Sequence, residues 1–193
     1  MVLVFAIAIG IVVGLALGGK VGRLADLQLR GMPLFAVAIA LQVLAFPAGI
    51  FPWEVPDSAA TALWLGTYGL LIAIVWLNRR VPGFVIAGAG MLSNLVAIVA
   101  NGGHMPALPS ALRGAGVAFD GVYQNSVANG SPNVAWLVDR WAAPEWVLGA
   151  NVYSVGDVLL GVGGIVIVVA AMGPRLPGRR APVQVGPADG TGD

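Results

Sequence analysis

Long apolar stretches separated by short polar ones make up most of the chain. A helix that crosses the hydrocarbon core of a bilayer needs about 20 mainly apolar residues, and five stretches come close to that length. These predicted spans are residues 2–18, 32–50, 61–77, 82–101 and 153–172. Residues 102–152, which follow the fourth span, are too polar and too rich in Gly and Pro to cross a membrane. The pattern predicts an all-α, polytopic transmembrane bundle of about five helices with one long loop.

Basic residues are distributed unevenly among the segments that connect the predicted spans. Lys and Arg collect on the cytoplasmic side of membrane proteins, and eight of the ten in this chain fall on one side of a five-span arrangement. The eight are Lys20, Arg23, Arg30, Arg79, Arg80, Arg175, Arg179 and Arg180. The other two, Arg113 and Arg140, lie in the long loop. We therefore expect the N-terminus outside the cell, the C-terminus in the cytoplasm and residues 102–152 outside.

The domain organisation follows from the same pattern. Residues 1–172 form the predicted transmembrane domain, and residues 173–193 are rich in Pro, Gly and charge, which predicts a disordered cytoplasmic tail. Within the domain, Gly10, Gly14 and Gly18 leave one face of the first helix without side chains. Such faces let helices approach closely, and we expect this one to pack within the chain rather than between two copies.

The composition agrees with a membrane protein and excludes several functions. Hydrophobic residues make up 58% of the chain and charged residues 10%, whereas a soluble domain has about 25% charged residues. We therefore expect a multi-pass protein of the bacterial plasma membrane, surrounded by the lipid bilayer. A net charge of +1 provides no broad positive field to attract nucleic acid. Because the chain has no Cys and one His, we expect neither a metal site nor a cofactor.

Asp157 is the one acid within the predicted spans, and an ionisable residue there is a candidate functional residue. Ser154-Val155-Gly156-Asp157 has the spacing of a capping box, in which the serine and the acid satisfy free N–H groups at the start of a helix. The positive end of the helix dipole also favours a carboxylate at this position. Capping alone is therefore one interpretation of Asp157.

A second carboxylate gives Asp157 another interpretation. Asp139 lies in an apolar, Trp-rich stretch 18 residues earlier, and a proline between them would let the chain double back. Two nearby carboxylates share a proton, so that one acts as a base on water and the other as an acid. In this hypothesis Asn94 and Ser154 orient the pair. The alternative for Asp139 is an ion pair with Arg140 or another loop arginine.

Three residues near the expected outer surface are candidates for binding, namely His104, Asn101 and Tyr153. Asn101 and two glycines follow the fourth span, where Asn and Gly provide a left-handed helix cap. His104 either transfers protons or binds an anion, or it is a turn residue without a ligand. Tyr153 belongs with several tryptophans to an expected aromatic belt at the outer interface.

Three short motifs occur on this five-span plan. They are N-G-G-H-M-P at residues 101–106, Y-S-V-G-D-V-L at residues 153–159 and L-R-G at residues 29–31. Together they resemble a family of uncharacterised five-span bacterial membrane proteins, known as a domain of unknown function. The resemblance extends to about Met172. It implies the fold but brings no activity with it.

The two aspartates also lie in motifs that resemble a second family. Leu137-Val138-Asp139 is similar to a Val-Val-Asp motif, residues 152–157 to Phe-Asn-x-Ala-Asp, and residues 90–94 to Gly-x-x-Gly-Asn. All three motifs belong to signal peptidase II, the lipoprotein signal peptidase. The resemblance implies that Asp139 and Asp157 form a catalytic pair that cleaves a lipid-anchored peptide. Ala97 and Ile98 stand where that family has an acidic residue and an arginine, and the long loop has no counterpart there.

The sequence supports three classes of function to different degrees. It favours a non-catalytic membrane protein that binds a membrane protein, lipid or peptide through residues 102–152, or that acts as a subunit of a complex. The alternative is an aspartic intramembrane peptidase with Asp139 and Asp157 as its acid and base. Transport ranks last, since Gln42 and Asn94 alone do not provide polar groups at several depths of the membrane.

Overall fold

The computed structural model describes residues 2–46, 54–116, 122–123, 126–143 and 152–173, and it is mostly helical. The helices are α1 (Val2–Ala16), the 3-10 helix η1 (Val21–Asp26), α2 (Met32–Ala45), α3 (Asp57–Asn78), α4 (Phe84–Ala100), α5 (Pro109–Gly114) and α6 (Val155–Met172). Each of the five predicted apolar stretches overlaps one of the longer helices. Residues 174–193 of the predicted tail lie outside the described residues.

Local backbone conformation sets several helix ends that hydropathy alone places differently. The first predicted span runs to residue 18, but α1 ends at Ala16 and Gly18 has a left-handed φ of 76°. The fifth predicted span starts at residue 153, whereas Ser154 is extended and α6 begins one residue later. α3 begins at Asp57, before its predicted start, because polar residues continue the helix beyond the apolar run. Residues 47–50 of the second predicted span lie outside the described residues.

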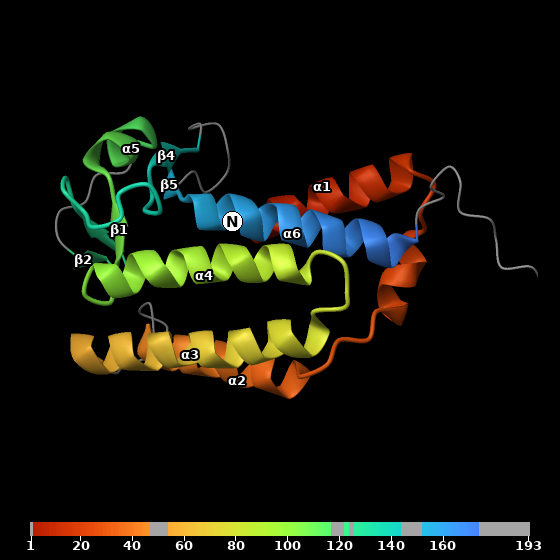
Figure 1. Ribbon diagram of the computed structural model, residues 1–193, viewed down its shortest axis with the longest axis horizontal. Coiled ribbons are helices and arrows are strands. Elements are labelled where there is room, and N and C mark those ends of the chain that lie inside the picture. Colours follow the sequence, from red (N-terminus) through yellow and green to blue (C-terminus); the bar gives the residue numbers. More distant parts are fainter. Residues whose placement is uncertain (1, 47–53, 117–121, 124–125, 144–151, 174–193) are drawn as a thin grey trace, which may run out of the picture.

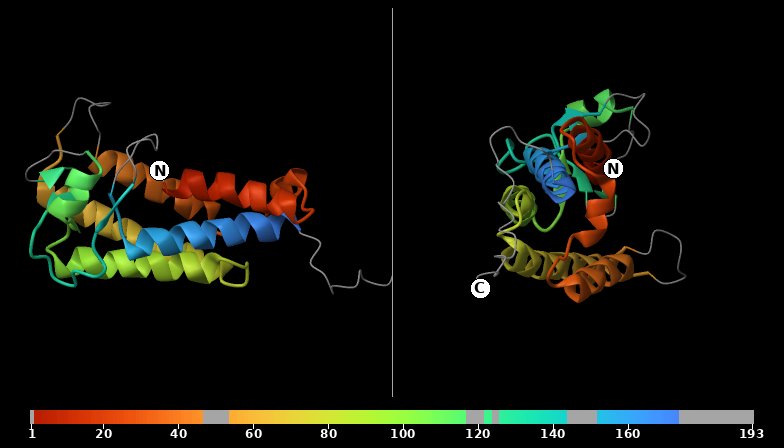
Figure 2. Two further views of the ribbon diagram at one scale, coloured as in Figure 1. Left: turned by 90° about the horizontal axis from the view of Figure 1, so that it is seen from above. Right: turned by 90° about the vertical axis from the view of Figure 1, so that its right-hand side faces the viewer.

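The longer helices form two layers (Figures 1 and 2). α1, α6 and α4 lie side by side in one layer, with α6 in the middle. α2 and α3 pack together and contact the first layer where α3 meets α4. The strands and α5 lie at one end of the helices, and η1 lies at the other end.

The glycines of α4 and α6 let these two helices approach closely. A Cβ atom on Gly90 of α4 would lie 2.7 Å from the backbone nitrogen of Leu160 in α6. In the same interface, a Cβ atom on Gly163 of α6 would lie 2.7 Å from the Cβ atom of Ala87. Real side chains do not fit at such distances, so the contact between the two backbones depends on glycine.

The glycine face predicted on the first helix also packs within the chain. A Cβ atom on Gly10 would lie 2.8 Å from the Cβ atom of Val168 in α6, and one on Gly14 would meet the side chain of Met172. Gly18 is not part of this face, because it follows the end of α1. Within the described residues, α6 therefore covers the face that we considered for dimer formation.

A small unit at one end of the helices contains all the described strands, and we call it the β unit (residues 102–116, 122–123, 126–143 and 152–153). Its first sheet has the order β1 (Met105–Ala107), β3 (Ser126–Ala128) and β2 (Val122–Tyr123), with β1 parallel and β2 antiparallel to β3. Its second sheet pairs β4 (Trp141–Ala142) with β5 (Val152–Tyr153) in antiparallel orientation. The predicted long loop is thus in part a folded unit.

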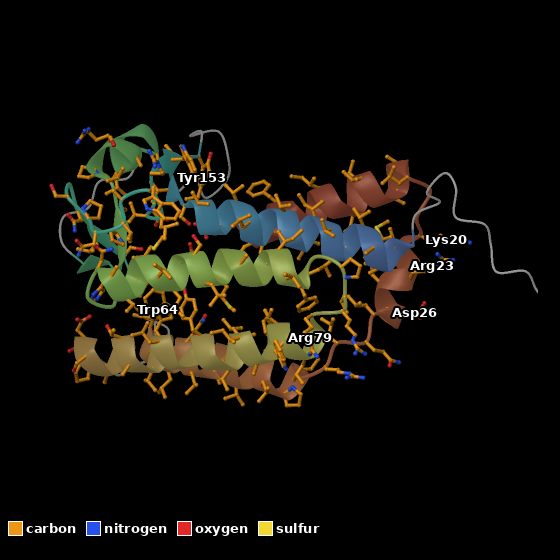
Figure 3. The ribbon with its side chains drawn as sticks, viewed as in Figure 1. Lys20, Arg23, Asp26, Trp64, Arg79 and Tyr153 are labelled. Carbon is orange, nitrogen blue, oxygen red and sulfur yellow. The ribbon has the colours of Figure 1, made fainter. Side chains whose placement is uncertain are left out.

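The β unit is anchored on the helices by a shared hydrophobic core. Met105, Leu137 and Val138 of the unit pack with Trp64 of α3 and Ile98 of α4. Figure 3 shows the Trp64 side chain between α3 and α4, at the end of the helices that carries the unit. This core fixes the position of the residue that follows Val138, which is Asp139.

Two helices among the described residues, α3 and α6, are long and apolar enough to cross a membrane, and α1, α2 and α4 are apolar but shorter. Their outward faces carry large apolar side chains, and α1 alone exposes Leu3, Val4, Phe5, Ile7, Ile9, Val12, Val13 and Leu15. A soluble monomer rarely exposes a continuous apolar surface of this extent. The surface therefore needs lipid or another protein to cover it.

Asn78 connects the end of α3 to the segment before α2. Its side-chain oxygen accepts a hydrogen bond from the Arg30 nitrogen, and its side-chain nitrogen donates to the Arg30 oxygen, both at 2.8 Å. The same nitrogen donates to the Ile74 oxygen at 2.8 Å. The side chain is buried, and it pairs with the Arg30 backbone much as a neighbouring strand would.

Asn78→Asp should lower the thermal stability of the protein. A carboxylate donates no hydrogen bond, so it would leave the carbonyl oxygen of Arg30 without this donor and would place a negative charge next to the carbonyl oxygens of Arg30 and Ile74. Leaving one buried polar group unpaired costs about 1–3 kcal/mol. Thermal unfolding in detergent measures the loss, with Gln28→Glu as a matched amide-to-acid change on an exposed residue. Equal stability of the two variants would contradict the role of Asn78.

Candidate functional site

Asp157 and Ser154 form the predicted capping box at the start of α6. The Asp157 nitrogen donates to Ser154 Oγ at 3.1 Å, and the Ser154 nitrogen donates to Asp157 Oδ2 at 2.9 Å. This reciprocal pair satisfies two N–H groups at the helix start. The capping interpretation of Asp157 is therefore confirmed, although it accounts for only some of the contacts of this carboxylate.

Asn94 of α4 reaches across the helix interface to the same carboxylate. Its Nδ2 atom donates to Asp157 Oδ1 at 3.1 Å. Ser154 Oγ lies 2.8 Å from both Asp157 Oδ2 and Asn94 Oδ1, and its one proton goes to one of these acceptors at a time. Asn94 occupies the space that a Cβ atom of Gly156 would need. Glycine at position 156 thus allows Asn94 to contact the acid.

Asp139 is held by backbone hydrogen bonds between the two sheets of the β unit. Its nitrogen donates to the Pro106 oxygen at 3.0 Å, and its oxygen accepts from the Leu108 nitrogen at 2.9 Å. On the other side, the nitrogen of Arg140 donates to the oxygen of Tyr153 at 3.2 Å. Since Tyr153 directly precedes the capping box, these contacts bring the Asp139 segment next to the start of α6.

Burial makes the Asp139 carboxyl group a much weaker acid than usual. The residue is only 8% exposed. Burial raises the pKa of Asp139 from 3.8 to about 8, and the negative charge of Asp157 contributes to this rise. The two carboxyl groups, 18 residues apart in sequence, therefore interact in the folded protein.

The predicted alternative for Asp139, an ion pair with an arginine, is wrong for the described residues. Within them the one ion pair joins His104 to Asp57. The Arg140 guanidinium lies over the Trp141 ring instead, 5.5 Å from its centre. Because no arginine neutralises Asp139 there, the carboxyl keeps its proton to a higher pH.

Asp139 and Asp157 lie in different environments. Asp139 is buried and protonated at neutral pH. Asp157 lies at the positive end of a helix and has three nearby donors: the Ser154 nitrogen, the Ser154 hydroxyl and the Asn94 amide. A buried acid that interacts with a second carboxyl group, itself held by hydrogen bonds, is an arrangement that general acid–base catalysis uses.

Tyr68 of α3 is a further member of the site that the sequence does not indicate. The charges of both Asp157 and Asp139 act on its hydroxyl group. Its ring packs edge-on against the Trp64 ring, with the centres 5.9 Å apart. A tyrosine within an apolar helix resembles any other core residue in sequence, and its distance along the chain from both acids conceals this electrostatic interaction.

The three candidate binding residues have local structural roles. His104 Nε2 lies 3.1 Å from Asp57 Oδ1 at the start of α3. The Tyr153 ring packs on Trp141, with 5.8 Å between centres (Figure 3 shows Tyr153 beside the start of α6). Asn101 is not the predicted left-handed cap, since its φ is −120°. Its side chain instead exchanges hydrogen bonds of 2.8 and 3.0 Å with the Asn133 backbone.

The glycines that follow Asn101 provide the left-handed conformation predicted there. Gly102 and Gly103 have φ values of 75° and 95°. Glycine adopts positive φ without strain. The Asn101 side chain forms hydrogen bonds with the Asn133 backbone instead.

The raised pKa of Asp139 predicts that the free energy of unfolding falls as the pH rises. Folded Asp139 keeps its proton up to about pH 8, whereas the unfolded residue releases it near pH 4. The folded state thus holds one more proton between these values, and stability falls by about 1.4 kcal/mol per pH unit there. Thermal unfolding at pH 5 and pH 8 measures this loss. Asp139→Asn should remove the pH dependence, and an unchanged dependence would contradict the burial of a neutral acid.

The model of a family described as "Family of unknown function (DUF5317)" matches residues 26–169. The matched residues contain the β unit and every residue of the site: Tyr68, Asn94, Asp139, Ser154 and Asp157. No curated protein and no solved structure matches the chain.

Proposed function

The chain belongs to this family of unknown function, and we propose that it is a multi-pass membrane protein that hydrolyses a peptide near the outer membrane surface. Asp139 and Asp157 are its acid and base. The observation that carries this proposal is a buried carboxyl with a pKa of about 8 that interacts with a hydrogen-bonded carboxylate.

The placement in the membrane rests on the helices and on the charges at their ends. α3 and α6 are long and apolar enough to cross, and the other three long helices are apolar. Figure 3 shows Lys20, Arg23 and Arg79 at the end opposite the β unit. With this basic end in the cytoplasm, the five helices cross the bacterial plasma membrane, the N-terminus lies outside and the β unit faces outward.

The two acids have complementary tasks in this hydrolysis. Asp157 removes a proton from a water molecule while the water oxygen bonds to the peptide carbonyl carbon, and Asp139 donates its proton to the carbonyl oxygen. As the C–N bond breaks, the proton on Asp157 passes to the leaving nitrogen. Asp139 regains its proton when the new carboxyl group forms. Asn94 and Ser154 hold Asp157 in place.

The position of the acids indicates a substrate that is itself attached to the membrane. Asp157 lies in the first turn of α6, where the helix meets the β unit. A peptide bond close to a lipid anchor or to the end of a transmembrane segment lies at this depth. A lipid-anchored peptide is therefore the substrate class that we propose.

The test uses the full chain in lipid nanodiscs with a set of lipid-anchored peptides. Cleavage is followed by mass spectrometry in water enriched in ¹⁸O, which labels the new carboxyl group if water attacks the bond. Labelled products at pH 7 support hydrolysis. If folded protein cleaves no peptide between pH 5 and pH 9, the hydrolase proposal is wrong.

A second candidate function is non-catalytic binding through residues 102–152, or a role as a subunit of a complex. The capping box favours it, because that contact gives Asp157 a structural purpose without any substrate. Trp136 and Trp141 of the β unit are 62% and 40% exposed, and they offer apolar surface to a protein or a lipid. This function predicts that Asp157→Asn is tolerated, whereas Trp136→Ala together with Trp141→Ala weakens the association.

A further inference from the structure

Two segments that together carry three exposed arginines meet at the end of the helices that lies opposite the β unit, and we call these residues the arginine cluster (Arg30, Arg79 and Arg80). The double hydrogen bond between Asn78 and the Arg30 backbone brings the two segments together. Arg79 and Arg80 directly follow Asn78 in the chain. Because Asn78 is buried, the cluster is held on a fixed backbone.

The charge of the cluster is not neutralised by any described part of the chain. All three side chains are exposed, and the one ion pair among the described residues involves none of them. The Arg79 guanidinium donates to the Trp76 oxygen at 2.7 Å and lies 4.2 Å from the centre of the Trp76 ring. Both of these partners are neutral, so three positive charges face outward.

Apolar side chains are exposed directly beside the cluster. Trp76 is 65% exposed and Met32 is 53% exposed. Leu77 is exposed too, and Gly31 packs against it: a Cβ atom there would lie 3.1 Å from Leu77 Cδ1. A cationic group above an apolar surface matches a molecule with an anionic head and a hydrocarbon chain.

We propose that the arginine cluster binds the headgroup phosphate of an anionic phospholipid, whose acyl chain lies along Met32, Trp76 and Leu77. Guanidinium groups bind phosphate oxygens in pairs of hydrogen bonds. Anionic lipids attract basic residues that lie beside a transmembrane helix. The proposal rests on insertion in the membrane and is independent of hydrolysis at the other end, so either proposal can fail alone.

The experiment compares the retention of phosphatidylglycerol and phosphatidylcholine by native mass spectrometry of the full chain. We expect the wild type to retain phosphatidylglycerol and to unfold at a higher temperature in nanodiscs that contain it. R30Q, R79Q and R80Q combined should weaken this retention roughly tenfold or more. R113Q is the matched control, because Arg113 is an exposed arginine in the β unit.

Two further measurements, on a charge-preserving variant and with inorganic phosphate, can also contradict the proposal. If the triple glutamine variant does not fold, R30K, R79K and R80K combined preserve the charge, and retention should fall to an intermediate value. Inorganic phosphate alone should neither stabilise the protein nor displace the lipid at millimolar concentration. Equal retention by wild type and triple variant, or equal stabilisation by inorganic phosphate, would overturn the assignment to a lipid.

Discussion

Replacing Asp157 by asparagine should reduce the proposed peptide cleavage at least about 1000-fold, because the base that activates water is lost. Asp139→Asn should cause a loss of similar size, since it removes the acid. The double variant should be hardly worse than either single one, because the two groups act as a unit. The measurement is the rate of product formation by nanodisc-embedded protein, corrected for the fraction that is folded.

Asp157→Glu separates catalysis from helix capping. Glutamate at this position of a capping box still reaches the serine backbone nitrogen, so the variant should fold nearly as well as the wild type. Its carboxyl group is displaced by one methylene, and misplacement by about 1 Å costs on the order of 100-fold in rate. Asp26→Asn is the control, as an exposed acid in η1 at the far end. If the two single variants, Asp157→Glu and Asp157→Asn, both keep full activity, Asp157 is not the catalytic base.

The pH dependence of cleavage has a defined sign. Asp139 donates a proton, and its pKa is about 8 because it is buried beside a negative charge. Cleavage should therefore fall as the pH rises through 8, as the acid loses its proton. A rate that continues to increase above pH 8 would assign the proton donor to another group.

Hydropathy alone predicted the five apolar helices, because each is a nearly unbroken apolar run. It could not predict the β unit, because strands of two or three residues have no periodic pattern and are held by hydrogen bonds to distant partners. The roles of Asn78 and Asn101 were hidden for a related reason. An asparagine at a helix end has the same sequence signature whether it caps the helix or pairs with a remote backbone segment.

The expected relation to a family of unknown function is confirmed, and the likeness to signal peptidase II stays a prediction.

The candidate site was predictable where its contacts are local. Ser154 and Asp157 are three residues apart, so their spacing was enough to predict the capping box. The sequence offered two environments for Asp139, an arginine partner or a second acid, and could not choose between them. The choice depends on the register that holds Asp139 between Pro106 and Leu108, which is a property of the folded β unit.

Replacing Gly156 by valine should prevent the protein from reaching its folded state. The position of the new Cβ atom is already occupied by the Asn94 side chain, and the Gly90 oxygen of α4 would lie 2.6 Å away. The side chain of Asn94 can rotate, but the backbone of α4 can move only if the two helices separate. Overpacking of this kind costs about 1–3 kcal/mol for one or two methylene groups, and two methyl groups against a backbone add to it.

Gly66→Val in α3 is the matched control, because no atom beyond its own stretch of helix lies within 4 Å of the position of its Cβ. Size-exclusion chromatography and thermal unfolding in detergent compare the two variants, and similar profiles would contradict the close contact of α4 with α6. Gly156→Ala is the informative intermediate. Where it folds, Asn94 must leave its place beside Asp157, so cleavage should fall even in the folded fraction. The glycine that brings the two helices together would then also determine the position of the base.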